Sequence, residues 1–197
     1  MKNLFLAASA AAALIATPAF AQVGPETEIY AGGSVGYHDI ESLDLSDFGA
    51  TGTLDVDGLV YGGFAGVKIG GEGNVFYGVE GNYMAGSDAI DAEYGVAALV
   101  GTKVGVADLY VRSGYQLVDF DTEFLANEGA DAFAMTGDDR NAFIVGFLDG
   151  FGDDDKAEGW LVGVGADVGL GNFMLRGNVD TIEFDSLRVS AGVGIRF

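Results

Sequence analysis

The sequence contains no cysteine, two prolines and a single histidine, and its 9 lysines and arginines face 30 aspartates and glutamates. Without cysteine the chain has no disulfide scaffold and no thiol chemistry, so its stability depends on packing and backbone pairing. A formal net charge of −21 argues against binding to nucleic acid, which requires basic patches. No phosphate-binding loop, zinc-ligand spacing or dinucleotide fingerprint is present, so we expect no cofactor.

Long apolar runs are also scarce, and the clearest one lies at the N-terminus. It extends from Leu4 to Ile15, follows Lys2, and precedes the small residues Ala19 and Ala21. The run is shorter than the roughly 18 residues that a membrane-spanning helix requires, which disfavours a retained anchor. The pattern is typical of a secretory signal peptide. We therefore expect cleavage after Ala21 and a single domain formed by residues 22–197.

Although the chain is acidic, 49% of its residues are hydrophobic, and from residue 28 onward apolar and polar residues alternate along separate segments. Alternation with a period of two indicates β-strands that have one apolar face. Repeated segments of about ten such residues are typical of transmembrane β-barrels. The segments are 28–38, 58–70, 74–85, 93–103, 108–118, 158–169, 172–184 and 187–197. Because an even number of strands allows an antiparallel barrel to close, the sequence predicts an all-β, eight-stranded, up-and-down transmembrane barrel.

The connections between these segments differ at the two ends of the predicted barrel. Short turns follow the second, fourth and sixth segments, whereas residues 39–57, 86–92 and 119–157 form longer, acidic connections. Short periplasmic turns and longer extracellular loops are the expected asymmetry. Inside the longest loop, Asn141–Gly150 is apolar and could extend the hairpin, pack as a lid, or pair with Phe124–Met135 to give ten strands. We prefer eight, because Phe124–Met135 alternates poorly.

Most basic residues fall on the strand faces opposite the apolar ones. A charge on the lipid face near the midplane would cost about 2–4 kcal/mol, so these side chains should point into the lumen. An eight-stranded barrel is just wide enough for its side chains to fill, which predicts a plugged lumen and leaves a narrow ion path as the alternative. The predicted lumen charges are Lys68, Lys103, Arg112, Arg176, Arg188 and Arg196, together with Glu80, Glu93 and Asp167.

Once the strand directions are assigned, the outward-facing aromatic residues form two groups, one near each end of the predicted barrel. Amphipathic rings favour the headgroup level, so two such groups predict aromatic girdles at the two membrane interfaces. Near the loop end lie Tyr37, Tyr61, Tyr83, Tyr94, Tyr115 and Trp160, and near the turn end lie Tyr77, Phe173 and Phe197.

The last strand, SLRVSAGVGIRF, resembles the C-terminal signal read by the barrel-assembly machinery, with Ser190, Gly192, Ile195 and Phe197 at the pattern positions. Together with YAGGSVGY and FYGVEGNYMAG, it makes residues 22–197 similar to the OmpA-type and opacity-type small outer-membrane barrels, often called porin-family proteins. The resemblance implies location in the cell outer membrane, contact with its lipid, and help from periplasmic chaperones and the assembly machinery. We expect no further domain after Phe197, so the resemblance does not imply peptidoglycan binding.

Residues for catalysis or metal binding are few. His38 shares its predicted inward face with Ser34, but the sequence places no third group beside them to orient a base, so we expect no enzyme activity. The run Asp153–Asp155 lacks the spacing of a calcium loop, so we expect no metal site. The sequence therefore predicts a non-enzymatic barrel that is structural or presents acidic loops to an extracellular ligand. A narrow passive pore for ions or small solutes is the alternative.

Overall fold

The computed structural model describes residues 27–44, 53–151 and 156–197. The predicted signal peptide with Ala19 and Ala21, and the acidic run 153–155, lie outside the described residues. The described part contains strands β1 (Thr27–Asp44), β2 (Thr53–Gly70), β3 (Val75–Ala85), β4 (Ile90–Val104), β5 (Ala107–Phe120), β6 (Lys156–Leu170), β7 (Phe173–Ile182) and β8 (Ser186–Arg196), and helices α2 (Thr122–Ala132) and α3 (Gly137–Phe151).

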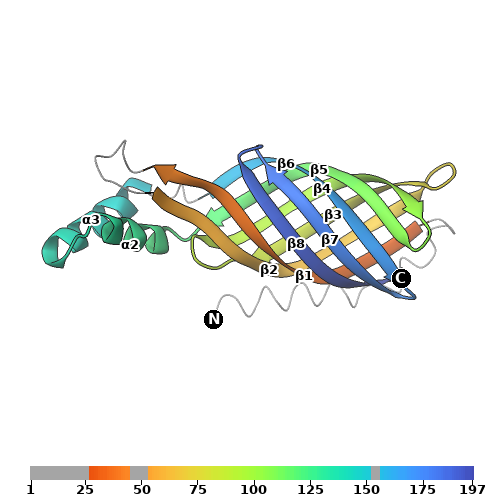
Figure 1. Cartoon of the computed structure of the whole chain (residues 1–197), viewed down its shortest axis with the longest axis horizontal. Coiled ribbons are helices and arrows are strands. Elements are labelled where there is room, and N and C mark those ends of the chain that lie inside the picture. The colour runs from red at the N-terminus through yellow and green to blue at the C-terminus, as the bar shows by residue number, and fades with distance from the viewer. Residues whose placement is uncertain (1–26, 45–52, 152–155) are drawn as a thin grey trace.

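The eight strands form one closed antiparallel barrel in which each strand pairs with its neighbours in sequence (Figure 1). The barrel closes where β8 pairs with β1, with Tyr30 opposite Arg196 and His38 opposite Arg188. Because every strand has a partner on both sides, the sheet has no open edge. The predicted eight-stranded meander is confirmed.

The two ends of the barrel differ in their connections (Figure 1). We call the end with the turns β2–β3, β4–β5 and β6–β7 the turn end, and the opposite one the loop end. At the loop end, β1 and β2 extend beyond the predicted 28–38 and 58–70, and their pairing continues to Asp44 opposite Thr53 after a register shift between Ile40 and Leu43. The predicted long loop 39–57 is thus partly a hairpin. The pairing of β1 with β8 ends at Ile40, so this hairpin extends past the closed ring, where strict alternation is not required.

The segment between β5 and β6 is a helical hairpin, so the ten-strand alternative is wrong. Helix α2 begins after Asp121, whose side chain accepts a hydrogen bond of 2.8 Å from the backbone N–H of Phe124. It ends in a left-handed turn at Ala134, where Met135 N–H donates to Ala130 O at 2.9 Å. The hairpin of α2 and α3 lies beyond the barrel at its loop end (Figure 1). Among the described residues, no helix is long and apolar enough to span a membrane.

Side chains alternate between the outer surface and the lumen, most regularly in β7. Several inward positions are glycine because neighbouring backbone leaves no space for a side chain. A Cβ atom at Gly114 would lie 2.0 Å from Val96 O, and one at Gly62 would lie 2.1 Å from Tyr83 O. Glycine at such points allows close approach of two backbones.

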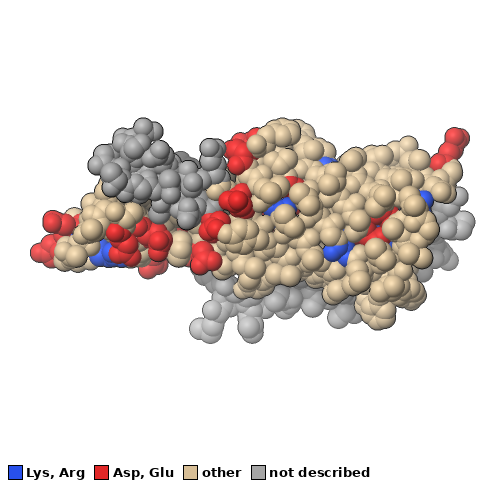
Figure 2. All heavy atoms as spheres, viewed as in Figure 1, with Lys and Arg blue, Asp and Glu red and all other residues tan. Residues whose placement is uncertain are grey.

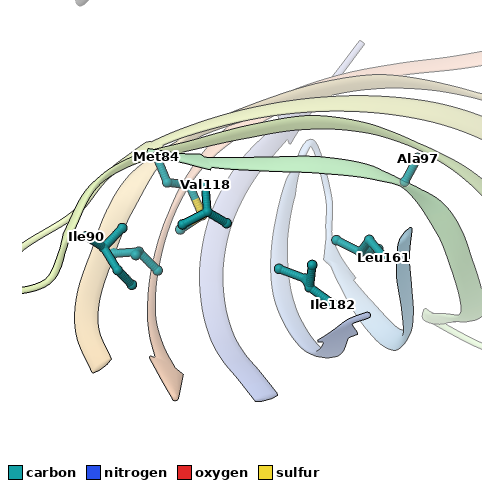
Figure 3. Packing of buried hydrophobic residues seen from close by; sticks show 7 residues of the cluster. Met84, Ile90, Ala97, Val118, Leu161 and Ile182 are labelled. Carbon is teal, nitrogen blue, oxygen red and sulfur yellow. The ribbon is translucent and has the colours of Figure 1, made fainter. Parts of the chain in front are cut away.

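An apolar cluster occupies the loop end of the lumen (Figure 3). Its members come from six strands, β2 to β7, and all are buried. They are Val60, Met84, Ile90, Ala97, Val118, Leu161 and Ile182, with Ile40 and Phe120 packed against them. Buried charged residues lie among these apolar ones, since Glu93 is paired with Met84 of β3 and with Val118 of β5.

Candidate functional site

The inner faces of the strands bring charged side chains together inside the barrel, and most of them are fully buried. Their ion pairs join into one continuous chain from the turn end to the loop end, which we call the lumen network. In order, it consists of Arg196, Asp108, Lys68, Asp167, Arg176, Glu80, Arg112, Asp180, Arg188, Glu93 and His38.

Three ion pairs of this network join strands that lie opposite one another in the closed ring. Lys68 of β2 pairs with Asp167 of β6, Glu80 of β3 with Arg176 of β7, and Glu93 of β4 with Arg188 of β8. In a ring of eight strands, partners four strands apart face each other across the interior. The lumen is therefore crossed by charged side chains at three levels.

Near the turn end, the network is centred on Lys68. Its ammonium group lies 2.7 Å from Asp108 Oδ2 and 2.8 Å from Asp167 Oδ2, so two carboxylates compensate one buried cation. The same nitrogen lies 5.0 Å from the centre of the Phe76 ring, within cation–π range. Arg196 lies nearer the mouth, 3.3 Å from Asp108 and 3.6 Å from Glu28.

The middle of the lumen is organised by Arg176. Its Nε and Nη2 donate to the two carboxylate oxygens of Asp167 at 2.7 and 2.8 Å, a bidentate geometry that a lysine could not adopt. Nη1 donates to Glu80, which also accepts a hydrogen bond of 2.8 Å from Tyr30 Oη. The guanidinium carbon lies 4.2 Å from the centre of the Phe64 ring. Polar contacts and ring contacts together fill this level.

At the loop end the network reaches His38. Arg188 donates to Glu93 and, at 3.1 Å, to Asp180. Arg112 lies 3.5 Å from Asp180 and 3.4 Å from Glu80, which connects this level to the middle one. His38 Nδ1 contacts the second oxygen of Glu93.

His38 also contacts a serine, but not the one weighed from the sequence. Its Nε2 lies 3.0 Å from Ser186 Oγ, whereas Ser34 lies opposite Gly62 and Gly192 further down β1. Glu93, His38 and Ser186 thus form a row that includes the orienting group that the sequence could not place. However, the Ser186 hydroxyl donates to Ile182 O at 3.1 Å and therefore acts as an acceptor toward His38. Catalysis by a general base would require the serine hydroxyl to donate its hydrogen bond to the histidine, because the base receives the serine proton.

The network is almost balanced in charge. Five carboxylates, those of Glu80, Glu93, Asp108, Asp167 and Asp180, face five basic side chains, those of Lys68, Arg112, Arg176, Arg188 and Arg196. Glu28, which lies near Lys68 and Arg196, adds a sixth carboxylate beside the network. The large acidic excess of the sequence therefore lies outside the lumen. Among the described residues, no cluster of three or more His, Asp or Glu side chains forms a candidate metal site.

Eight of the nine charges that the sequence predicts for the lumen lie in this network, and Lys103 is the exception. It is exposed, and it lines an open depression at the turn end with Glu28 and Arg196. Its position near the end of β4 allows the long side chain to reach water instead of entering the packed interior. Asp108 and Asp180 were not predicted as lumen charges, although each shares an inward face with a predicted arginine. Residues an even number of positions apart on a strand lie on the same face, and this spacing could have predicted both aspartates.

The predicted girdle residues lie on the outer surface. Eight have exposed side chains: Tyr37, Tyr61, Tyr77, Tyr83, Tyr115, Trp160, Phe173 and Phe197. Tyr94 is half-buried because its ring stacks on that of Tyr83, with 6.3 Å between the ring centres. Tyr115 and Trp160 lie opposite each other on β5 and β6, and their rings pack edge to face with 6.2 Å between the ring centres. Between these rings, the outer surface is dominated by valine, leucine and isoleucine.

The residues of the predicted assembly signal lie along β8 and just beyond it. Ser190 and Gly192 face inward, opposite Gly36 and Ser34, and Ile195 faces outward. Phe197 follows the strand, with an exposed ring and a backbone N–H that donates to Ile29 O at 2.8 Å.

No protein-family model matches the chain, and no curated protein matches its sequence. Solved structures do match. A de novo designed transmembrane β-barrel is 14% identical, with a TM-score of 0.47, over 88% of this chain and 98% of that chain. The attachment invasion locus protein Ail of Yersinia pestis, in complex with a heparin analogue, is 13% identical with a TM-score of 0.48, over 87% and 98%. Neisserial surface protein A is 13% identical with a TM-score of 0.46, over 86% and 97%. Likeness at this level carries no argument about activity.

Acidic side chains gather on the outside of the molecule at the loop end (Figure 2). Those of the helical hairpin are Asp121, Glu123, Glu128, Asp131, Asp138, Asp139 and Asp149. Arg140 is the single basic residue of the hairpin, and it pairs with Asp131. The hairpin is therefore a strongly anionic projection from a barrel whose interior is nearly neutral.

Proposed function

We propose that this protein is a bacterial outer-membrane β-barrel whose lumen is closed by its own side chains and whose loop end faces the outside of the cell. Its role is structural or in surface interaction. The carrying observation is the lumen network, in which three ion pairs join opposite strands of the ring. The apolar cluster packs around the loop-end part of the network in the same interior.

Placement in a membrane is supported by the outer surface. Its apolar side chains face outward without any covering layer of protein, and aromatic rings lie toward both ends of the strands. A lipid bilayer is the environment that such a surface requires, and bacterial barrels of this kind reside in the outer membrane. The lipid of that membrane is accordingly the first partner.

A closed lumen is supported by the energetics of ion movement. A hydrated ion would have to displace side chains such as Arg176, whose donors are held by two carboxylates. Separating a buried ion pair leaves uncompensated charge and costs about 3–5 kcal/mol. Steady conduction is therefore not expected of the native barrel.

Planar-bilayer recording of the refolded protein tests closure. We expect no steady single-channel steps from the native chain, under conditions in which an open porin conducts. Insertion is checked in the same preparation by the shift in gel mobility between unboiled and boiled samples. Steady steps from correctly folded protein would show that it is a narrow pore instead.

Export by a signal peptide and assembly through the C-terminal pattern belong to the same proposal. We expect Phe197→Ser to lower the amount of barrel assembled in the outer membrane without affecting export to the periplasm, where chaperones hold unassembled chains. Phe173→Ser is the matched control, because this ring is also exposed near the turn end but lies outside the pattern. Equal loss of assembly in both variants would contradict a specific role of the terminal aromatic residue.

A further inference from the structure

The tip of the helical hairpin carries an open groove of about 680 Å³. Its apolar side is formed by Phe133, Met135, Ala142 and Phe143, and its polar side by Thr136 and Asp139. Clefts of about 300–1,000 Å³ are typical of sites that accept ligands. The groove lies at the turn that joins α2 to α3. Figure 1 shows this helical hairpin beyond the loop end of the barrel.

The apolar side of the groove is held in place by aromatic packing. The rings of Phe133 and Phe143 are 5.7 Å apart, and those of Phe143 and Phe147 are 6.0 Å apart. The base of the hairpin is attached to the barrel, because Leu125 packs with Ala89 of the β3–β4 connection and Asp121 N–H donates to Ala89 O at 3.0 Å. The hairpin thus presents a formed apolar surface at a defined position.

The charge around the groove restricts what can occupy it. Asp138 and Asp139 are exposed in the first turn of α3, and Asp139 lines the groove itself. The basic side chain that follows, Arg140, is already paired with Asp131 and Asn127. A second copy of this hairpin and a phosphate-rich lipid surface would both bring negative charge to negative charge. Like charges that face each other across an interface oppose binding.

The geometry points to a cationic amphipathic segment of a partner protein as the ligand of this groove, a conclusion that rests on the proposed outward orientation of the loop end. Its apolar face would lie on Phe133, Met135 and Phe143, and its lysine or arginine side chains would reach Asp138 and Asp139. An amphipathic helix in a hydrophobic groove is a recurrent mode of peptide recognition. Complementary charge at the rim then provides specificity and speeds association.

Binding of synthetic peptides to the full chain in phosphatidylcholine nanodiscs tests this assignment. The probe is a fluorescent amphipathic helix of leucine and lysine, read by anisotropy with empty nanodiscs subtracted. One comparison peptide has the same composition in a scrambled order without an apolar face, and another has glutamate in place of lysine. We expect the probe to bind at least about tenfold more tightly than either comparison peptide. Raising the salt concentration should weaken its binding, because exposed charges are screened.

Two variants separate the groove from the rest of the hairpin. Ala142→Glu places a carboxylate on the exposed wall of the groove and should weaken probe binding by about tenfold. Val145→Glu is the matched control on the same helix, since Val145 is exposed and does not line the groove, and it should change the affinity by no more than about twofold.

Equal affinities of the two variants, or of the native protein and empty nanodiscs, would overturn the assignment. The mobility shift and the bilayer trace are measured on the same preparations. A folded, silent barrel that binds no probe refutes the groove alone, whereas a conducting or unfolded protein refutes the proposed function.

Discussion

Replacement of Arg176 by methionine should destabilise the barrel strongly, because it removes the cation that joins β7 to both Asp167 and Glu80. The substitution keeps an unbranched side chain of similar length but deletes two hydrogen bonds of 2.7 and 2.8 Å to Asp167 and a third to Glu80. Removing one partner of a buried ion pair typically costs about 3–5 kcal/mol. Asp167 keeps Lys68 at 2.8 Å and Glu80 keeps Tyr30, so we expect the lower end, about 3 kcal/mol.

A double-mutant cycle with Asp167→Asn distinguishes this explanation from simple loss of packing. Once the Asp167 side chain is neutral, loss of Arg176 leaves only Glu80 without this cation, and Glu80 keeps Tyr30 at 2.8 Å and Arg112 at 3.4 Å. Lys68 still has Asp108 at 2.7 Å. The combined loss should therefore be smaller than the sum of the single losses by about 1–3 kcal/mol. Arg140→Met is the surface control, because its ion pair with Asp131 lies on the exposed hairpin and should contribute about 1 kcal/mol or less.

Urea unfolding in lipid vesicles, followed by the fluorescence of the single tryptophan, measures these differences. Trp160 is well placed as a probe, since its indole is exposed on the outer face near the loop end. The free energy of unfolding follows from the midpoint and slope of the transition. An Arg176→Met loss no greater than that of Arg140→Met, or strict additivity with Asp167→Asn, would refute the role given to the central ion pair.

Three further substitutions test other parts of the structure. Gly114→Ala should lower the free energy of unfolding by about 1–3 kcal/mol, because its Cβ atom would lie 2.0 Å from a backbone oxygen. Gly33→Ala should be nearly neutral, because its Cβ atom would lie 3.5 Å from the nearest atom. Equal unfolding midpoints of the two variants in urea would contradict this. Val164→Arg in the middle of β6 should lower the free energy of unfolding in lipid vesicles by about 2–4 kcal/mol. Val106→Arg at the β4–β5 turn should lower it by no more than about 1 kcal/mol. A larger loss for Val106→Arg would exclude the lipid-facing assignment of β6. Ala134→Gly should stabilise the helical hairpin by about 1 kcal/mol, because Ala134 has a φ of 51°, which glycine adopts without strain. We expect slower proteolysis within residues 121–151 and an unchanged unfolding midpoint of the barrel. Faster cleavage would count against this explanation.

The barrel could be predicted from the sequence because the constraint that produces it acts on every second residue. An apolar outer surface and a packed interior impose alternation on each strand, so strand number and facing can be obtained without knowing any contact. The ion pairs could not be obtained in this way. Glu80 and Arg176 are far apart in sequence, and only the closed register brings them together. His38 was weighed with Ser34 on its own strand, whereas its actual partner Ser186 lies on β8.

The helical hairpin was missed for a different reason. Alternation of apolar residues identifies only strands, and this segment lacks it, whereas its signals are helical. Asp121 stands three residues before Phe124, the position from which a cap is expected, and the apolar residues Phe143 and Phe147 are four residues apart. An acidic cap followed by apolar residues with helical spacing would have predicted helices within 119–157.

Pairing of β1 with β8 also has a consequence for how the molecule forms. The two strands that complete the ring come from opposite ends of the chain, with Tyr30 opposite Arg196. Contacts between such distant segments form slowly, because a long stretch of chain must be ordered before they contribute. Until β8 arrives, the outer backbone groups of β1 are exposed for pairing with other chains. A chain that lacks its last strand would therefore aggregate or be degraded, and would not persist as a smaller barrel.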